Sequence, residues 1–469
     1  MTAHAGHVLV VAYDFPPHAA IGTMRTLRVV RQLHESGWQV TVLTGDPRSF
    51  LATTPVDQKL LERVPAGVHV VRAGSIRGWQ RLQQGIRGAR PAHTSTATAP
   101  AAAPRGTTQP RTRSGLVAAL ARGKDVVDAA LAIPDREIGW LLPAITRGVF
   151  AATRGSRPDL IYASSPPWSG MLVATALKSI LRLPLVADFR DPWARAPWRG
   201  DRYPFALRAA GRLERHVVAA ADRIVFVAQG NRDDFAAFYG ADVATKFHVV
   251  PNGCDPAEFD QLPTPERRAD VHVMLHAGSL YGGRTPVPLF KGIARAIKAG
   301  TLDRDRFRLR FLGATSMQSV DLPAACRDAG IEPLVEFTPR VPRADSIRAM
   351  TEAGSLLLLQ PGHTVSVPGK VYEYLAAGRP ILSIAEEGET AHVVRSSGVG
   401  LSLTPDDEAG IAEGIATVVR MAAAGVPRAP REIYDGNLGA ATIEAILRAA
   451  LRAPLDATQA AASDGRQAS

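Results

Sequence analysis

Residues 7–44 of this 469-residue chain read HVLVVAYDFPPHAAIGTMRTLRVVRQLHESGWQVTVLT. The run 7–13 is continuously apolar, which is typical of a strand buried on both faces of a parallel sheet. Leu27, Val30 and Leu33 follow at helical spacing, Gly37 suits a helix end, and 38–44 is apolar again. The stretch predicts a βαβ unit with a loop over 14–22 after its first strand.

The same alternation continues along the chain. Strand-like runs recur at 158–164, 183–189 and 222–228, and a second series begins after the polar run 262–270, at 271–279, 307–314, 334–340, 355–361 and 380–385. Helical patterns at 286–300 and 368–378 separate strands of the second series. The fold class is therefore α/β, with two doubly wound, Rossmann-like domains in tandem.

The expected boundaries follow from these patterns and from composition. The first domain covers 1–262 and contains a basic insertion at about 79–124, of which 93–114 is rich in Thr, Ala, Pro and Arg and is expected to be disordered. The second domain covers 263–435, a helix covers 436–452, and 453–469 is expected to be a disordered tail.

Composition excludes several classes of protein. Hydrophobic residues make up 46% of the chain and charged residues 21%, which is typical of a folded enzyme. Cys254 and Cys326 are the only cysteines, too few for a disulfide scaffold or a cysteine-rich zinc site. The sequence has neither a signal peptide nor an apolar run of about 18 residues, so we expect a cytoplasmic protein.

The formal net charge of +11 is concentrated in one segment. Residues 72–124 contain ten Lys or Arg and no Asp or Glu, and Trp79, Leu82 and Ile86 lie at helical spacing there. This segment predicts contact with an anionic membrane surface, peripheral to the inner face of the cytoplasmic membrane. The alternative is an exposed, disordered insertion. No nucleic-acid partner is expected, because aromatic interleaving and nucleic-acid fold motifs are lacking.

Loops at the carboxyl ends of parallel strands are the expected places for ligands. The first, 14–25, has Gly22 before a helix, where backbone can approach an anion. The second, 276–292, has Gly278, Gly282 and Gly283, then Arg284, with Lys291 in the helix that follows. Glycines, a helix N-terminus and an arginine together predict a diphosphate site, the alternative being that Arg284 only solvates a turn.

Two further loops carry charged residues. In 366–382, Pro368 suits the first helical position, Gly369 and Lys370 lie in the first turn, and Glu373 follows one turn later. Lys370 can neutralise phosphate and Glu373 can accept ribose hydroxyls, unless Glu373 is a surface residue paired with Lys370 or Arg379.

The remaining loop, 187–198, has Asp188, Arg190 and Asp191 at a strand end. These residues either orient an acceptor hydroxyl or form a structural ion-pair cluster. No metal-ligand spacing is present among the histidines and cysteines, so no metal site is predicted.

Several motifs in order along residues 7–405 resemble the family 4 glycosyltransferases. They are YDFPPHAAIGTMR near the start, SSPP at 164–167, DFRDPW at 188–193, PNGCD at 251–255, HAGSLYGGR at 276–284 and PGKVYEYLAAGRPIL at 368–382. The resemblance is to bacterial members that take part in polysaccharide biosynthesis, building exopolysaccharide, capsule or lipid-linked glycans.

The resemblance implies a GT-B architecture, with a terminal helix that crosses back to the first domain. It implies transfer of a sugar from a nucleotide-diphosphate sugar to a glycan, lipid-linked or small-molecule acceptor, with retention of configuration and no obligatory metal or cofactor. Arg284 and Lys370 or Lys291 would stabilise the departing diphosphate, and Glu373 would match the second glutamate of the family's E-x7-E pattern, which holds the ribose.

Two departures from the pattern stand out. The first glutamate of E-x7-E falls on Val365, so sugar recognition is expected to use backbone N–H groups around 366–369. The family's histidine in the first domain is replaced by the DFRDPW segment, where Asp191 is the residue expected to position the acceptor. The alternatives are a nucleotide-sugar epimerase or hydrolase on the same fold, and a basic nucleic-acid-binding protein.

Overall fold

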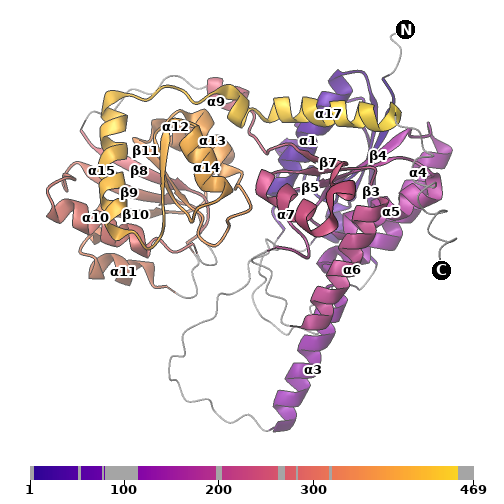
Figure 1. Cartoon of the computed structure of the whole chain (residues 1–469), viewed down its shortest axis with the longest axis horizontal. Helices are drawn as coiled ribbons and strands as arrows, with labels where there is room; N and C mark the ends of the chain where they lie inside the picture. Colours follow the sequence, from indigo (N-terminus) through magenta and orange to yellow (C-terminus); the bar gives the residue numbers. More distant parts are fainter. Residues whose placement is uncertain are drawn as a thin grey trace.

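The computed structural model describes residues 5–50, 54–76, 79, 115–196, 203–261, 270–280, 284–315 and 320–452. These residues form two α/β domains joined by a connection over 250–260 (Figure 1). The segments 93–114 and 453–469, which the sequence predicts to be disordered, lie outside the described residues.

The first domain is built on a parallel sheet whose described strands have the order β3-β2-β1-β4-β5-β6-β7. The strands are β1 (His7–Val11), β2 (Gln39–Gly45), β3 (His69–Ala73), β4 (Leu160–Ser165), β5 (Leu185–Phe189), β6 (Arg223–Phe226) and β7 (Phe247–Val249). All five residues of β1 are buried, as its continuous apolar run predicts. The strand order reverses between β1 and β4, which places ligand-binding loops at the carboxyl ends of these two strands.

Helices cover both faces of this sheet and account for the burial of β1. The helices of this domain are α1 (Ile21–Glu35), α3 (Gly115–Leu131), α4 (Leu141–Arg154), α5 (Ser169–Leu181), α6 (Pro204–Ala220), α7 (Gln229–Tyr239) and α8 (Ala241–Ala244), with short 3-10 turns η1 (Pro47–Ser49), η2 (Gln58–Arg63) and η3 (Arg136–Trp140). Helix α3 does not cover the sheet but projects away from it (Figure 1). Leu9 and Val11 share a core with Leu177 of α5. Val8 and Val10, which alternate with them, share the opposite core with Leu27 of α1.

The second domain repeats this topology. Its described strands form a parallel sheet with the order β10-β9-β8-β11-β12-β13. They are β8 (His272–Ala277), β9 (Phe307–Leu312), β10 (Val335–Thr338), β11 (Ser355–Leu359), β12 (Ile381–Ile384) and β13 (Gly400–Leu403). The helices are α10 (Val287–Lys298), α11 (Leu322–Asp328), α12 (Arg343–Glu352), α13 (Lys370–Ala377), α14 (Glu389–Ser396), α15 (Glu408–Ala424) and α16 (Arg431–Tyr434), with the turn η4 (Glu332–Leu334); α9 (Ala257–Asp260) lies in the connection.

The last described helix, α17 (Gly436–Arg452), crosses back to the first domain and packs beside α1 (Figure 1). Ile443 and Leu447 are fully buried in the core that contains Val8 and Leu27. Between them, the Glu444 carboxylate accepts hydrogen bonds from Trp38 Nε1 at 3.2 Å, Ser36 Oγ at 2.7 Å and Gln32 Nε2 at 2.9 Å. The expected return of the terminal helix to the first domain is therefore confirmed.

Two helix starts differ from the sequence pattern. Helix α1 begins at Ile21, two residues before the pattern suggests. Helix α13 begins at Lys370 with Gly369 as its N-cap, because Val371 N bonds to Pro368 O at 3.0 Å in a turn that precedes the helix. Pro368 therefore lies outside the helix, and Lys370 is its first residue.

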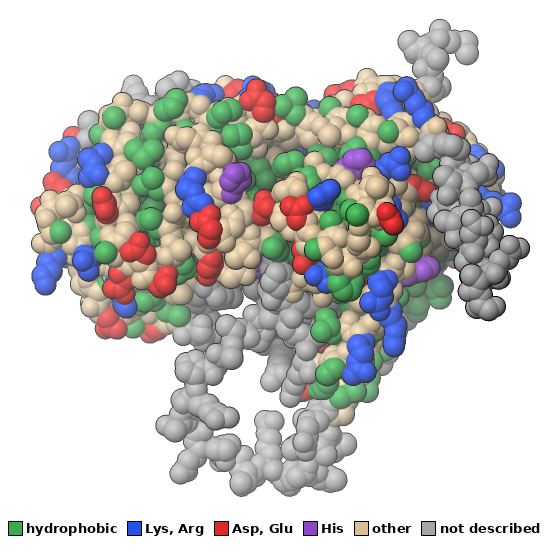
Figure 2. Space-filling model, in the orientation of Figure 1, with side chains coloured by type: hydrophobic (Ala, Val, Ile, Leu, Met, Phe, Trp, Pro, Cys, Tyr) green, Lys and Arg blue, Asp and Glu red, His purple; other side chains and the backbone are tan. Residues whose placement is uncertain are grey.

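The surface shown in Figure 2 gathers Lys and Arg side chains where α6 projects from the first domain. Arg208, Arg212 and Arg215 of α6 are exposed, and Phe205 and Leu207 at the start of the helix are 38% and 45% exposed. Within the described part of the chain, none of the helices has the length and apolar composition needed to cross a membrane.

The packing of α17 on the first domain generates a stability prediction. Replacing the fully buried Leu447 by alanine leaves a cavity, and we expect the free energy of unfolding to fall by about 3 kcal/mol. Leu438 on the same helix is 50% exposed, so Leu438→Ala is the matched control, with an expected change of about 0.5 kcal/mol or less. Urea unfolding followed by tryptophan fluorescence measures both; equal losses would contradict this packing.

Candidate active site

A pair of cationic side chains lies at the carboxyl end of β8 in the second domain. Gly278, the residue after β8, has φ +122°, and a Cβ placed on it would lie 2.2 Å from Lys370 Nζ. Only glycine therefore lets the Lys370 ammonium approach this strand end. Burial and the nearby Arg284 lower the pKa of Lys370 to about 8. The fold thus brings together Arg284 and Lys370, which are 86 positions apart in the chain.

Two histidines accompany this pair. His276 is 1% exposed, and its Nδ1 lies 3.0 Å from Leu357 O. Burial, with Lys370 and Arg284 nearby, lowers the pKa of His276 well below its ordinary value, and burial with Arg284 lowers that of His363 to about 4. Both rings are neutral at pH 7, so the positive charge of this site comes from Arg284 and Lys370. Such a pair at a strand end, beside the N-terminus of α13, is suited to a diphosphate.

The other residues expected at the diphosphate have different placements. Gly369 caps the N-terminus of α13 next to Lys370, whereas Gly282 and Gly283 lie outside the described residues. Lys291 lies on the outer face of α10, where its Nζ is 2.8 Å from Glu408 Oε1 and its side chain is 58% exposed. The structure does not bring Lys291 to Arg284 and Lys370.

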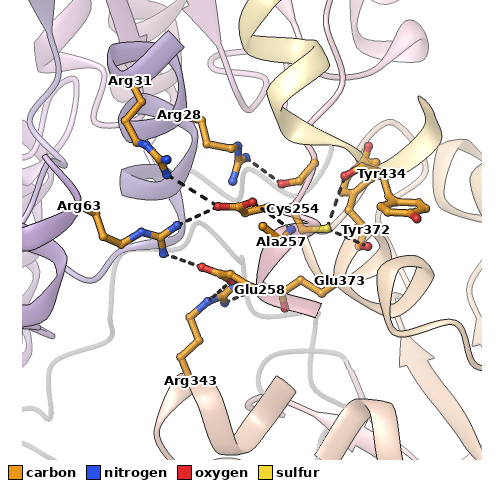
Figure 3. Close-up of polar contacts among 12 residues, drawn as sticks. Arg28, Arg31, Arg63, Cys254, Ala257, Glu258, Arg343, Tyr372, Glu373 and Tyr434 are labelled. Atoms are coloured by element: carbon orange, nitrogen blue, oxygen red, sulfur yellow. Dashed lines mark hydrogen bonds and ion pairs between the residues drawn. The ribbon is translucent and has the colours of Figure 1, made fainter. Parts of the chain in front are cut away.

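Glu373, the expected ribose ligand, lies one turn after Lys370 on α13. Its partner is neither of the residues considered in the sequence, because Arg343 Nη1 donates a hydrogen bond to its Oε1 at 2.8 Å. Arg379 instead bonds to Thr351 O through Nε at 2.7 Å. Glu373 is therefore part of a charged group at the domain connection, which is drawn in Figure 3.

Arginines from both domains converge on that connection. Arg28 Nη2 of α1 donates to Gly253 O at 2.8 Å, and Arg63 Nη1 of η2 donates to Glu258 Oε1 at 2.6 Å. Cys254, which the structure buries, points its Sγ at the carbonyl oxygens of Tyr372 and Tyr434 at 3.4 and 3.5 Å (Figure 3). The connection is thus bonded to α1 and η2 of the first domain and, through Cys254, to α13 of the second.

In the first domain, Asp188 has a structural role. It is fully buried, and its two oxygens accept hydrogen bonds from Arg25 Nε at 2.8 Å and Nη2 at 3.0 Å. Tyr162 Oη also donates to Asp188 at 2.7 Å. These contacts match the structural ion-pair interpretation of this aspartate.

Gly22 and Arg190 lie against each other at the start of α1. A Cβ on Gly22 would lie 1.6 Å from Arg190 Nη1, so the absence of a side chain at Gly22 leaves room for this guanidinium. Arg190 also bonds to Pro166 O and lies 3.6 Å from Asp14. The neighbouring Asp191 has a raised pKa, because the effect of burial is larger than the opposing effect of the Arg190 guanidinium.

Three further residues near Arg190 at the carboxyl edge of the first sheet were not singled out from the sequence: Asp14, His18 and Glu137. His18 Nδ1 lies 2.9 Å from Asp14 Oδ1. Burial, together with the nearby Asp135 and Asp14, raises the pKa of Glu137 above its ordinary value. No local pattern marks Glu137, because it lies 123 positions after Asp14 in the chain and only the fold brings the two together.

The arrangement can do two kinds of chemistry. The second domain offers fixed positive charge for a polyphosphate, and the first offers carboxyl, imidazole and guanidinium groups for hydroxyls. Among the described residues, no group of three or more His, Cys, Asp or Glu is placed to hold a metal ion.

Two family models match most of the two domains. Residues 104–258 match Glycosyltransferase Family 4, and residues 272–421 match Glycosyl transferases group 1. Among curated proteins, D-inositol 3-phosphate glycosyltransferase of Kineococcus radiotolerans is 30% identical over 42% of this chain and 47% of its own. The same enzyme of Gordonia bronchialis is 27% identical over 53% of this chain and 56% of its own. The chain thus spans about half the length of these relatives.

Solved structures share the fold over nearly the whole chain. The N-terminal domain of Candida albicans trehalose-6-phosphate phosphatase has a TM-score of 0.60 and 12% identity, covering 95% of this chain and 97% of its own. HepE of Anabaena, in complex with UDP and glucose, has a TM-score of 0.55 and 16% identity, covering 95% and 100%. With a GT-B fold and both domains matched by glycosyltransferase models, the chain belongs to the family 4 glycosyltransferases.

Proposed function

We propose that this protein transfers a sugar from a nucleoside-diphosphate sugar to a glycan, lipid-linked or small-molecule acceptor, with retention of configuration. The observation that carries the proposal is the pairing of Arg284 with Lys370 at the carboxyl end of β8. Negative charge develops on the diphosphate as the sugar leaves, and fixed cations stabilise that charge without an obligatory metal.

The sugar itself would be held by backbone at the N-terminus of α13. Val365 stands where the family has a glutamate, and no described residue accepts a hydrogen bond from the N–H groups of Ser366, Val367 or Gly369. These three donors, close to Lys370, support the expectation that main-chain N–H groups recognise sugar hydroxyls or phosphate oxygens.

The acceptor would bind at the carboxyl edge of the first sheet. There Asp191 would position the acceptor hydroxyl, with Arg190 close to it. The names of the relatives suggest a phosphorylated polyol as one acceptor to try, and Arg190 offers a charge for such a phosphate. The rival, an epimerase or hydrolase, would consume the donor at full rate without any acceptor.

Donor binding by the wild type and two variants is the central experiment. We expect UDP, the ligand of HepE, or GDP or ADP to raise the melting temperature of the wild type. Arg284→Ala and Lys370→Met each remove a charged hydrogen-bond donor, and titration calorimetry should show an affinity lower by about tenfold or more.

Lys291→Met is the matched control, because Lys291 forms an exposed ion pair with Glu408. We expect its nucleotide affinity to stay within about twofold of the wild type. Loss of binding in Lys291→Met but not in the other two would place the donor elsewhere, and no binding by the wild type would contradict the proposed function.

The pKa of Lys370 generates a pH prediction. The group is charged below pH 8 and loses its proton above it, so affinity for a nucleoside diphosphate should fall as the pH rises from 8 to 10. A bound diphosphate raises this pKa, which spreads the loss over the whole interval. Titration calorimetry at intervals of half a pH unit measures this fall in affinity. The Lys370→Met variant should bind the nucleotide weakly and with an affinity that does not depend on pH. If its affinity falls with pH as steeply as that of the wild type, another group is responsible for the titration.

We also propose that the protein meets an anionic membrane at the surface of α6. Most of the basic segment 72–124 lies outside the described residues, but α6 adds three exposed arginines and the apolar Phe205 and Leu207. Basic residues attract anionic lipid while exposed apolar side chains insert at the interface.

Changing Arg208, Arg212 and Arg215 together to glutamine tests this surface. At about 1 kcal/mol for each arginine, partitioning onto vesicles containing phosphatidylglycerol should fall by roughly a hundredfold. The control changes Arg304, Arg327 and Arg348, which are exposed on the second domain, to glutamine. Equal losses in both triple variants, or none in the α6 variant, would contradict a lipid contact through α6.

A further inference from the structure

Arg343, the first residue of α12, lies between two carboxylates that belong to different parts of the molecule (Figure 3). Its Nη1 donates to Glu373 Oε1 of α13 at 2.8 Å. Its Nε and Nη2 donate to the same oxygen of Glu258, in the domain connection, at 2.9 and 2.5 Å. The guanidinium therefore joins the expected ribose ligand to the connection.

Glu258 is itself anchored to the first domain. Arg63 Nη1 donates to its second oxygen at 2.6 Å, and Arg63 Nη2 donates to Asp255 Oδ2 at 3.2 Å. The side chains of Glu258 and Glu373 are only 18% and 25% exposed, so these pairs are sheltered from the solvent that weakens surface ion pairs. A continuous path of charge-assisted hydrogen bonds thus runs from η2 to α13.

The charges of this path persist at neutral pH. Burial alone would raise the pKa of Glu258, but Arg343 and Arg63 together lower it below its ordinary value. Burial alone would lower the pKa of Arg343, whereas Glu373 and Glu258 raise it. Glu258 is therefore ionised, and Arg343 stays protonated between its two carboxylates.

We infer that Arg343 is a positioning residue for the donor nucleotide: held by Glu258, it fixes the carboxylate of Glu373 in the orientation that accepts the ribose hydroxyls. The inference rests on the proposed function, since it requires a nucleotide at α13. Arg343 occupies Glu373 Oε1, and no described residue donates to Oε2, which leaves that oxygen for the ribose. A carboxylate held in one plane forms such bonds with less loss of side-chain entropy.

The test compares nucleotides that differ only in the ribose hydroxyls. UDP, GDP and ADP are each titrated beside their 2′,3′-dideoxy analogues into the full-length protein. For the nucleotide that binds, the wild type should prefer the ribonucleotide by about tenfold or more, because hydroxyls that donate to a carboxylate form strong hydrogen bonds. Arg343→Gln and Glu373→Gln should reduce this preference to about threefold or less, mainly by weakening the ribonucleotide.

Further variants separate positioning from general damage. Glu258→Gln should give an intermediate preference, because Arg343 keeps Glu373 but loses its charged anchor. Arg343→Lys should restore part of the preference, since a lysine supplies charge without the planar fork. Arg310→Gln is the matched control: Arg310 is also 40% exposed and pairs with Glu336, so its preference should equal that of the wild type. These variants keep the test decisive if Arg343→Gln fails to fold.

The outcomes separate the two proposals. A structural defect would weaken both members of each nucleotide pair equally, so an unchanged ratio in Arg343→Gln and Arg343→Lys overturns the role of Arg343. An unchanged ratio in Glu258→Gln overturns the anchoring by the connection. If the wild type discriminates but these variants do as well, the proposed function stands without this inference; if it binds none of the six nucleotides, the proposed function fails first.

Discussion

The buried ion pair of Arg25 with Asp188 sets how the chain leaves the first domain. Besides its two bonds to Asp188, the guanidinium donates to Val250 O at 3.1 Å and Pro251 O at 3.0 Å. One side chain of α1 thereby ties the carboxyl end of β5 to the start of the domain connection. A charge buried in this way is stable only while every donor is satisfied, so the path of the connection is constrained as strongly as the core.

Arginine side chains also bind the rest of the domain connection. Arg28, Arg63 and Arg343 bind successive groups along residues 253–258, and Arg31 lies 3.8 Å from Asp255. These four arginines lie outside the basic segment 72–124, so they bind groups within the molecule and are separate from the charge expected to meet an external partner. A second interdomain contact lies on another side, where Glu389 Oε1 accepts a hydrogen bond from Gly230 N at the start of α7, at 2.5 Å. The N-terminus of that helix favours the negative charge it receives.

A feature could be predicted from the sequence where its pattern lies within one segment, and not where it depends on contacts between distant segments. Apolar runs predicted the inner strands of both sheets, because a strand buried on both faces is apolar over five or six consecutive residues. They did not predict the edge strands β3, β7 and β13, which are only partly buried. The same local reasoning could have excluded Lys291, since Leu289, Phe290 and Ile293 define the buried face of α10 and place Lys291 outside it. The approach of Lys370 to Gly278, the partner of Glu373 and the raised pKa of Glu137 all depend on contacts between distant segments, which no spacing along the chain encodes.

Burial raises the pKa of an acid on one side of the candidate site and lowers the pKa of a base on the other side. Burial penalises charge, so it favours a protonated Glu137 in the first domain and a deprotonated Lys370 in the second. In the ligand-free protein the proximity of Arg284 adds repulsion to that penalty at Lys370. A dianion bound between the two cations, as proposed for the donor, would remove the repulsion and supply the missing counter-charge. Only above the Lys370 pKa of about 8 would part of the intrinsic binding energy be offset by restoring the proton to Lys370.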